Sequence, residues 1–350
     1  MSNDIQAWGS GPTRYFYELQ PDTILAAIES QGYLPTGRLM PLNSMENRVF
    51  EVEVLPPESE VDSESDRFRI MKFYRPGRWS KDQILDEHQF TQELADQDIP
   101  VITAEASSQS ESCHFLEELG IYYAIYKKQG GRNPDELDRN QLEWIGRLLA
   151  RMHNVGANHP APHRIEIGPE RYGLQALDYL FEHECIPEDL ELRYEDLVEE
   201  ICQRSEPLFQ ACQKIRLHGD AHQGNLLWSA TGPFWVDFDD MVMGPAVQDL
   251  WLLAAVRGQD GYSQLASMLR GYRWLRKFPQ EELSLIEPLR ALRYIHFSAW
   301  IAKRWSDPAF PRTFTEFGSR DYWMTQIEDL QECLQLIIEP DPGLFSSTSL

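Results

Sequence analysis

The chain contains the segment His218-Gly-Asp-Ala-His-Gln-Gly-Asn-Leu-Leu227, and Phe234-Trp-Val-Asp-Phe-Asp239 follows it closely. Leu226–Trp228 and Phe234–Val236 are short apolar runs with aromatic residues, which is typical of buried strands. Thr231-Gly-Pro233, which lies between them, has the composition of a turn. We therefore predict a β-hairpin in this part of the chain.

Three polar residues flank the predicted hairpin. Asp220 and Asn225 precede its first strand, and Asp237 follows its second strand. Asp and Asn are common in turns, so each of these residues alone would be interpreted as a turn residue. A phosphoryl-transfer site needs one carboxylate that accepts a hydroxyl proton, and Asn and Asp oxygens that hold Mg²⁺. The spacing of all three residues around one strand pair favours this functional interpretation.

This segment resembles the catalytic segment of a known superfamily of kinases. The pattern is His-Gly-Asp at 218–220, four further residues, Asn225, and an apolar strand that ends in Asp237. It is similar to the pattern of the aminoglycoside phosphotransferase and choline kinase superfamily, whose members are similar in fold to protein kinases. The resemblance implies phosphoryl transfer from ATP with Mg²⁺ as the metal ion.

Three further stretches resemble a narrower family, the bacterial stress response kinase A family. They are Gly244–Trp251, the Trp-rich segment Tyr294–Trp305, and Asp307-Pro-Ala-Phe-Pro311. The resemblance runs from about Tyr33 to Leu336, which is nearly the whole chain. The tryptophans are equally well explained as the aromatic core of a helical lobe, so this segment indicates kinship and not chemistry.

The resemblance implies an α+β, bilobal, protein kinase-like fold, and the composition of the chain fits it. Strand patterns and one long helix dominate up to about residue 130, and helical periodicity dominates after it. We therefore predict a small β-rich, nucleotide-binding lobe at 1–130 and a larger, mainly helical catalytic lobe at 131–350. Leu142, Ile145, Leu149 and Met152 share one face of a helix that we expect to end before Gly156.

Lys72 lies at the end of the apolar strand Phe68–Phe73 and resembles the kinase lysine that contacts the α- and β-phosphates. Alone, it would be read as an exposed strand lysine. A capping-box sequence at Ser80 opens a helix in which Glu87 falls on the apolar, inward face, whereas Asp86 falls on the outer side. An acid on a core face needs a cation, so we predict that Glu87 pairs with Lys72.

The phosphate loop departs from the kinase pattern, because no G-x-G-x-x-G is present. The corresponding stretch is Leu42–Arg48, in which Asn43 and Ser44 offer backbone N–H groups and a hydroxyl to phosphate. Lys127 and Lys128 fall at the lobe boundary, in the position of the kinase hinge that contacts adenine. We therefore include Ser44 and Lys128 among the nucleotide-binding candidates, together with Lys72 and Glu87.

The resemblance also assigns roles at the reaction centre. Asp220 is the expected general base or hydroxyl-orienting residue, and Asn225 and Asp237 are the expected Mg²⁺ ligands, with Asp237 also counted as catalytic. Asp249 resembles the acid that braces the catalytic loop in this superfamily, although it has a plain capping role too. His218 is expected to hold the loop through a backbone hydrogen bond.

Asp239 and Asp240 lie two and three positions after Asp237. They either contact the metal ligands without binding the metal themselves or are simple loop acids, and we favour loop acids.

The composition excludes some classes of partner. The formal net charge is −24, from 32 Lys and Arg and 56 Asp and Glu, which disfavours nucleic acid and anionic membrane surfaces. A cationic substrate or a basic protein segment would be attracted, although such a charge also serves solubility. The five cysteines are scattered without a C-x-x-C pair and indicate reduced thiols. We expect a cytoplasmic protein, because the start of the sequence has no secretory pattern and no apolar run spans a bilayer. We also expect a monomer.

Three functions fit these residues. The first, which we predict, is a Ser/Thr protein kinase of the stress response kinase type that phosphorylates protein substrates and also itself; the other two are alternatives. The second is a small-molecule kinase for an aminoglycoside, choline-like amine or amino alcohol, attracted by the acidic run Glu182–Glu200. The third is a metal-dependent hydrolase in which His218, Asp220 and His222 bind the metal. An inactive nucleotide-binding module is disfavoured because all the expected catalytic groups are present.

Overall fold

The computed structural model describes residue 16 and residues 18–56, 63–106 and 111–348. The chain divides into two compact units, which are described separately. The first comprises the described residues of Met1–Arg132 together with Leu227–Asp239, and the second comprises those of Asn133–Leu226 and Asp240–Leu350. The mixture of strands and helices confirms the predicted α+β class. The lobe boundary at residue 130 stays a prediction, and the segment Leu227–Asp239 packs with the first unit.

The first unit is built on a five-stranded sheet in which every neighbouring pair is antiparallel. The strand order is β1-β2-β3-β5-β4. Their bounds are Pro35–Leu42 for β1, Arg48–Val54 for β2, Phe68–Phe73 for β3, His114–Leu116 for β4 and Ile121–Lys127 for β5. Lys72 pairs with Ala124 in the register of β3 and β5, which places it in the middle of the sheet.

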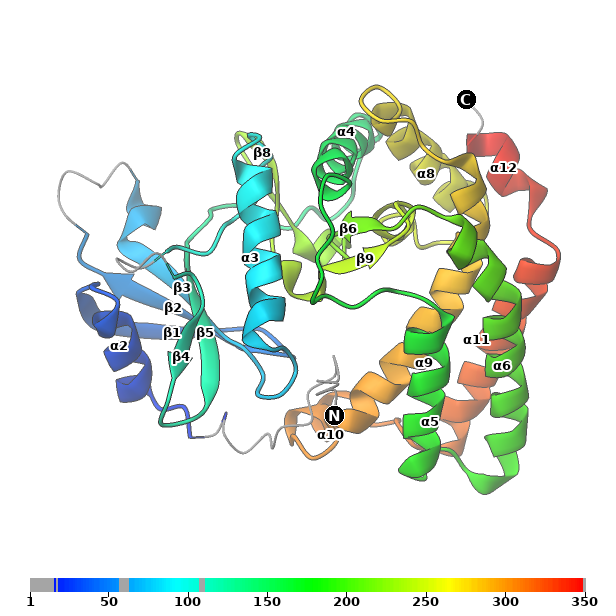
Figure 1. The fold of residues 1–350 in the computed structure, drawn as a ribbon, viewed down its shortest axis with the longest axis horizontal. Helices are drawn as coiled ribbons and strands as arrows, with labels where there is room; N and C mark the ends of the chain where they lie inside the picture. Colours follow the sequence, from blue (N-terminus) through cyan, green and yellow to red (C-terminus); the bar gives the residue numbers. More distant parts are fainter. Residues whose placement is uncertain (1–15, 17, 57–62, 107–110, 349–350) are drawn as a thin grey trace. The chain divides into compact units, whose positions relative to one another are not determined.

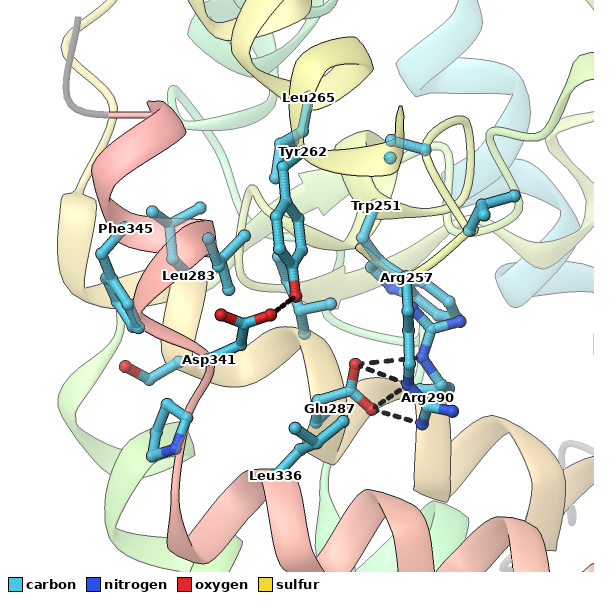
Figure 2. A pocket seen from close by; sticks show the side chains of 17 residues that line it. Trp251, Arg257, Tyr262, Leu265, Leu283, Glu287, Arg290, Leu336, Asp341 and Phe345 are labelled. Carbon is cyan, nitrogen blue, oxygen red and sulfur yellow. Dashed lines mark hydrogen bonds and ion pairs between the residues drawn. The ribbon is translucent and has the colours of Figure 1, made fainter. Parts of the chain in front are cut away.

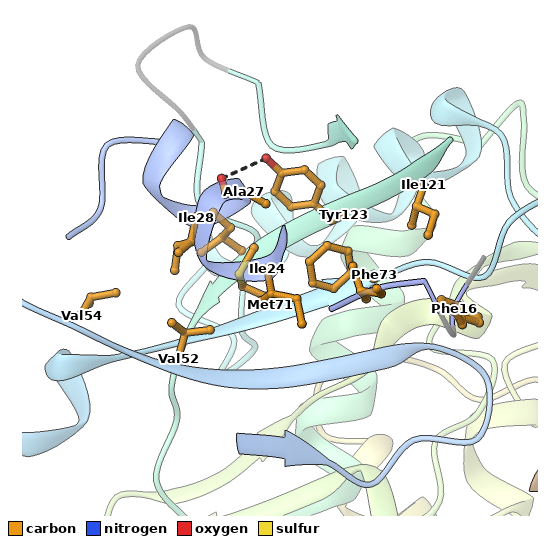
Figure 3. Packing of buried hydrophobic residues seen from close by; sticks show 12 residues of the cluster. Phe16, Ile24, Ala27, Ile28, Val52, Val54, Met71, Phe73, Ile121 and Tyr123 are labelled. Atoms are coloured by element: carbon orange, nitrogen blue, oxygen red, sulfur yellow. Dashed lines mark hydrogen bonds between the residues drawn. The ribbon is translucent and has the colours of Figure 1, made fainter. Parts of the chain in front are cut away.

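Helix α2 (Pro21–Ser30) covers one face of this sheet (Figure 3). Its apolar side chains pack against strand residues of the core, and the Tyr123 hydroxyl donates a 3.3 Å hydrogen bond to the Ala27 carbonyl. Met71 and Phe73 face α2, and because side chains alternate along a strand, Lys72 points to the opposite face. The buried cluster contains Phe16, Ile24, Ile28, Val52, Val54, Met71, Phe73, Ile121 and Tyr123.

Helix α3 (Lys81–Ala95) lies on the Lys72 side of the sheet and begins at the predicted capping box. Ser80 Oγ accepts a hydrogen bond from the Gln83 N–H, and the Gln83 side chain accepts one from the Ser80 N–H. Glu87 is buried, as predicted. Asp86 is buried too, so its expected outward position is wrong. The helix is covered from two sides, by β3 through Glu87 and by Phe238 through the ring of Phe90, which widens its buried face.

The predicted β-hairpin is present as β7 (Leu226–Ser229) and β8 (Gly232–Trp235), which pair with each other. Trp228 exchanges backbone hydrogen bonds with Arg132, and the Trp235 N–H donates to the Pro100 carbonyl at 3.0 Å. Trp235 is fully buried. These contacts attach the hairpin to the first unit and fix the segment that carries Asp237 and Asp239.

The second unit is mainly helical, as Figure 1 shows. Apart from the hairpin, the described residues of this unit contain one pair of strands, β6 (Ile215–Leu217) and β9 (Val242–Gly244), which are antiparallel. The longer helices have a core face. The helices are α4 (Arg139–Gly156), a π-helical turn (Glu170–Leu174), α5 (Gln175–Glu182), α6 (Glu188–Ala211), α7 (Gln248–Trp251), α8 (Gln259–Tyr272), α9 (Ile286–Lys303), α10 (Ala309–Thr313), α11 (Arg320–Ile338) and α12 (Pro342–Thr348).

Helix α4 buries the four apolar residues that were expected to share its inner face. It does not end before Gly156, as we expected, but continues through it. A Cβ at Gly156 would lie 2.2 Å from the Arg216 carbonyl oxygen. Glycine is needed here because the helix approaches the backbone of β6 closely, and not because the helix stops.

Two predictions about the whole chain can be compared with the described residues. All five cysteines have free thiols. Within the described part of the chain, no helix is long and apolar enough to cross a membrane.

Candidate active site

In the first unit, the ammonium group of Lys72 is surrounded by three carboxylates. Lys72 Nζ lies 3.0 Å from Asp237 Oδ1, 3.0 Å from Asp239 Oδ1 and 3.8 Å from Glu87 Oε1. Lys72, Glu87 and Asp239 are 6%, 2% and 3% exposed. β3, α3 and the segment after β8 each supply part of this cluster. The predicted pair of Lys72 and Glu87 is therefore present, and Asp237 joins it.

The charges of this cluster keep Lys72 protonated. Burial alone lowers the pKa of the Lys72 ammonium, but Asp237, Asp239 and Glu87 more than offset it, so the pKa lies well above its ordinary value. The three carboxylates differ in access to solvent, because the Asp237 side chain is 52% exposed. Asp237 also has a φ of 60°, a left-handed conformation that Asp tolerates better than most residues. Asp237 is thus the acid of the cluster that faces outward.

The interpretation of Asp239 as a loop acid is wrong. Its carboxylate is buried between two cations, Lys72 and Arg78, and pairs with both. Arg78 is itself 4% exposed. Sequence reasoning missed this pair because Arg78 lies in the turn after β3 and 161 positions before its partner. Asp240 is exposed, in agreement with a loop acid.

The loop that holds Ser44 is fixed by the same arginine-rich turn. The Asn47 N–H donates to Ser44 Oγ at 3.2 Å, and Asn47 Oδ1 accepts from the Arg75 N–H at 3.1 Å. Glu46 pairs with Arg75 at 3.0 Å and with Arg78 at 3.7 Å. The loop therefore has a defined conformation without glycine. The role of Ser44 in phosphate binding stays a prediction.

The Lys128 side chain is engaged on the sheet. Its Nζ lies 2.7 Å from Glu51 Oε2 and 4.3 Å from the centre of the Phe68 ring. These contacts direct the ammonium group to β2 and β3. A contact of this residue with adenine, which stays a prediction, would therefore use its backbone groups.

In the second unit, the Asp220 carboxylate is held by the guanidinium of Arg293 and the imidazole of His222. Arg293 Nη1 donates to Asp220 Oδ1 at 3.0 Å, and His222 Nε2 lies 3.2 Å from Oδ2. Asn225 Nδ2 donates to the Asp220 carbonyl at 3.0 Å. Burial raises the pKa of Asp220. The hydrogen bond from His222 and the charge of Arg293 lower this pKa by more than burial raises it, so the net shift is downward. Asp220 is therefore ionised. Arg293, on α9, was not anticipated from the sequence.

The backbone beside Asp220 is braced by Asp249, in agreement with the expectation for that residue. The Asp249 carboxylate is fully buried and accepts from the His218 N–H at 2.8 Å and the Gly219 N–H at 2.9 Å. His153 Nε2, from α4, lies 3.1 Å from the same carboxylate. Gln248 Nε2 donates to the Gly219 carbonyl at 2.8 Å. The short helix α7 therefore fixes the position of the loop that carries Asp220.

Gly219 is required by two independent constraints. Its φ is 84°, in the left-handed region that other residues avoid. A Cβ at this position would lie 2.0 Å from the Asp240 carbonyl oxygen. His218 Nδ1 accepts from the Asp220 N–H at 3.4 Å, which agrees with the backbone role expected for His218.

The side chains expected to hold a divalent cation have suitable chemistry. Asp237 Oδ1 pairs with Lys72, and the rest of this half-exposed carboxylate is accessible. Asn225 commits its Nδ2 to Asp220, which leaves the amide oxygen as the atom for a cation. Carboxylate and amide oxygens are ligands that Mg²⁺ prefers. Each of the two side chains, taken by itself, therefore offers an oxygen that suits the ion.

The alternative metal cluster of His218, Asp220 and His222 is not formed. His218 Nδ1 and His222 Nδ1 both accept from backbone N–H groups, of Asp220 and Gly224. Across the described ranges, no group of three His, Cys, Asp or Glu side chains is placed to hold a metal ion. The geometry gives the hydrolase alternative no support.

A pocket elsewhere in the second unit lies among α8, α9, α11 and α12 (Figure 2). Its polar groups are paired with one another. Tyr262 donates to Asp341 at 2.8 Å, and Arg257 Nη2 lies 2.6 Å from Glu287 Oε2. No residue predicted for the active site lines it. Its apolar lining includes Trp251, Leu265, Leu283, Leu336, Leu344 and Phe345.

Comparison with known proteins adds the following findings. Residues 40–284 match the model of the phosphotransferase enzyme family. Stress response kinase A of Escherichia coli (strain K12) is 36% identical over 329 residues, with 93% of this chain and 95% of the relative covered. A protein of Salmonella typhimurium named serine/threonine protein kinase RdoA is 37% identical over 333 residues, with the same coverage.

The fold of this chain is similar to that of several solved structures. An amicoumacin kinase in complex with AMP-PNP, Ca²⁺ and Ami has a TM-score of 0.69 and 18% identity, covering 95% of this chain and 99% of that one. A microcompartment-associated aminopropanol kinase has a TM-score of 0.62 and 18% identity, covering 93% and 98%. At such low identity these similarities show the fold alone, and they confirm the predicted protein kinase-like class.

Proposed function

This chain belongs to the phosphotransferase enzyme family and is a relative of the stress response kinases, and on that premise we propose that it phosphorylates Ser and Thr hydroxyls of proteins. The chain is a kinase, and the reaction of this class uses ATP and a divalent metal ion. We assign the metal as Mg²⁺. When bound, this ion neutralises charge on the phosphates and orients the transferred group.

The observation that carries the phosphoryl-transfer part of this proposal is the ion-pair cluster of the buried Lys72 with Glu87 and Asp237. Kinases hold a lysine against the phosphates of ATP with a helix glutamate, and the acid next to it binds the metal. Here Glu87 and Asp239 are buried while Asp237 is exposed. The buried acids position Lys72, and the exposed acid is the one available to a metal ion.

We assign the chemical step to Asp220. The acceptor hydroxyl oxygen bonds to the γ-phosphorus, the bond to the β–γ bridging oxygen breaks, and ADP leaves. The hydroxyl proton passes to the Asp220 carboxylate, which is ionised in the structure. The brace from Asp249 holds the loop so that little reorganisation is needed during the reaction. Asn225 and Asp237 are the proposed ligands of Mg²⁺.

The proposed acceptor is protein, including this chain itself, and the proposed working form is a cytoplasmic monomer. The name of the Salmonella typhimurium relative, serine/threonine protein kinase RdoA, supports a protein acceptor, whereas the names of the two structural neighbours are those of small-molecule kinases. An amine acceptor is the alternative, but Arg293 puts a positive charge beside Asp220, which disfavours a cation there.

The test is incubation of the full chain with Mg²⁺ and ATP labelled at the γ-phosphorus. One set of reactions contains no acceptor, one contains an acidic and a basic protein, and one contains a panel of amines and amino alcohols. We expect label on Ser or Thr of protein, and no label with Asp220→Asn. Efficient labelling of an amine, with none on any protein, would replace this proposal with the small-molecule kinase.

A further inference from the structure

The feature behind this inference is the ion pair between Arg293 and the catalytic carboxylate. Arg293 Nη1 lies 3.0 Å from Asp220 Oδ1, and the two side chains are 44% and 21% exposed. Arg293 stands on α9, 73 positions after Asp220 along the chain. It is therefore an accessible cation at the atom that must receive an acceptor hydroxyl.

A purely structural role explains this pair poorly. An ion pair with one half-exposed partner contributes little to stability, since water competes for both groups and the long side chain loses entropy. The backbone of the Asp220 loop is already fixed by Asp249 and Gln248. Arg293 is thus free to exchange partners when an acceptor arrives.

The acceptor hydroxyl competes with Arg293 for the Asp220 carboxylate. An arginine that gives up a carboxylate partner needs another anion, since its planar guanidinium favours bidentate pairing with carboxylates and phosphates. A cationic acceptor would instead be repelled by the freed guanidinium. An acidic side chain on the acceptor satisfies both requirements.

The surface next to Arg293 fits a peptide chain. Phe297 lies one turn further along α9 and is 42% exposed. Its ring stacks on Trp300, with ring centres 5.4 Å apart. The aromatic surface of Phe297 and Trp300 lies beside the Arg293 cation. An extended peptide acceptor could therefore place an apolar residue on the rings and an acidic residue against the guanidinium.

We propose that Arg293 is a specificity-determining residue that selects Ser/Thr segments carrying an acidic side chain next to the acceptor hydroxyl. This inference rests on the proposed protein kinase function. The net charge of −24 attracts basic segments at long range, but salt screens such attraction beyond about 10 Å. Arg293 acts at contact distance, where the choice between acceptors is made.

The experiment compares three Ser peptides that differ only beside the Ser, where they carry Glu, Gln or Lys. For the full-length protein with Mg²⁺ and ATP, we expect kcat/KM for the Glu peptide to exceed that for the Lys peptide by about tenfold or more. Arg293→Glu should reverse this order, mainly through KM for peptide, with KM for ATP unchanged. Arg293→Lys should retain part of the preference as a point charge.

Arg320→Glu is the matched control. Arg320 is an exposed arginine of the same unit that pairs with Asp189 at 2.7 Å, so its reversal changes the net charge equally without touching Asp220. It should keep the wild-type order of peptides. The thermal midpoints of unfolding of all variants show whether they fold. The comparison of the three peptides with the wild-type protein tests the proposal even if a variant does not fold.

The outcomes separate the two proposals. Peptides labelled without regard to charge, or a preference for the Lys peptide, would overturn the inference and leave the kinase function intact. The same holds if Arg293→Glu keeps the wild-type order, or if it lowers kcat equally for all three peptides. Label on amines alone, with no protein or peptide labelled, would overturn both proposals.

Discussion

The Asp239 carboxylate lies 3.0 Å from the Lys72 ammonium, inside the first unit and almost out of contact with solvent. Asp237, two residues earlier, pairs with the same ammonium at the same distance but is half exposed. Two acids that look alike in the sequence therefore have different tasks. Asp239 is part of the folded core of the site, and Asp237 faces the solvent side of Lys72.

The first prediction separates these two acids by stability. Asp239→Asn removes the charge that Lys72 and Arg78 share, and breaking such a buried pair costs about 3–5 kcal/mol of the free energy of unfolding. Asp237→Asn should cost less than about 1 kcal/mol, because its ion pair is half exposed and Asn tolerates its φ of 60°. Urea unfolding of both variants measures the difference, and equal losses would show that the burial of Asp239 has no energetic weight.

The second prediction separates binding from chemistry. Asp220→Ala should keep the affinity for Mg-nucleotide roughly intact and lower turnover by about 10²–10⁴-fold, because Asp220 acts on the acceptor hydroxyl. Asp237→Ala should weaken both, since a metal ligand acts on bound nucleotide. Calorimetric titration with a non-hydrolysable nucleotide gives affinity, and label transfer gives turnover. If both variants lose nucleotide to the same extent, the two roles are misassigned.

The third prediction uses two glycines with nearly the same positive φ. Gly219 and Gly258 have φ of 84° and 82°, but a Cβ at Gly258 meets nothing within 4 Å, whereas at Gly219 it meets the Asp240 carbonyl oxygen. Gly258 has φ of 82° and ψ of −166°, a backbone conformation that only glycine adopts readily, so Gly258→Ala should cost about 1–3 kcal/mol from its backbone conformation alone. Gly219→Ala should cost clearly more and abolish label transfer. Chemical unfolding of the pair, with activity measured alongside, isolates the contribution of the close contact.

The fourth prediction concerns pH. Burial is the main cause that raises the pKa of Glu282 from 4.5 to about 7, with Glu281 adding to it, against the Val247 N–H and Arg276, which lower it. Between these values the folded chain holds a proton that the unfolded chain has lost, so stability falls as pH rises through this window. Above pH 7, ionisation of Glu282 lowers the free energy of unfolding by its full amount, at most about 3 kcal/mol.

Glu282→Gln cannot ionise and keeps an oxygen that can accept from the Val247 N–H. Its stability relative to the wild type should therefore increase steadily from pH 5.5 to pH 8 and then level off. Unfolding midpoints at four or five pH values measure this. A difference that does not change with pH would mean that Glu282 is ionised throughout.

Several parts of the site could be predicted because each depends on local pattern. The hairpin follows from two apolar runs around a turn, and the inward position of Glu87 follows from helical spacing after a capping box. The same spacing failed for Asp86, because periodicity assumes one buried face and α3 has neighbours on two sides. The helix end expected at Gly156 failed because a glycine also permits close packing.

The sequence by itself determined which chemical groups are present, which of them share a strand, helix face or turn, and which family the pattern resembles. Only the tertiary structure decided the partners of those groups across the chain. Asp239 meets Arg78 over 161 positions, and Asp220 meets Arg293 over 73 positions. Spacing fixes the direction of a side chain within its own element, whereas such pairs depend on how separate elements pack. Burial, which sets the strength of each ion pair and the pKa of each group, depends on the same packing.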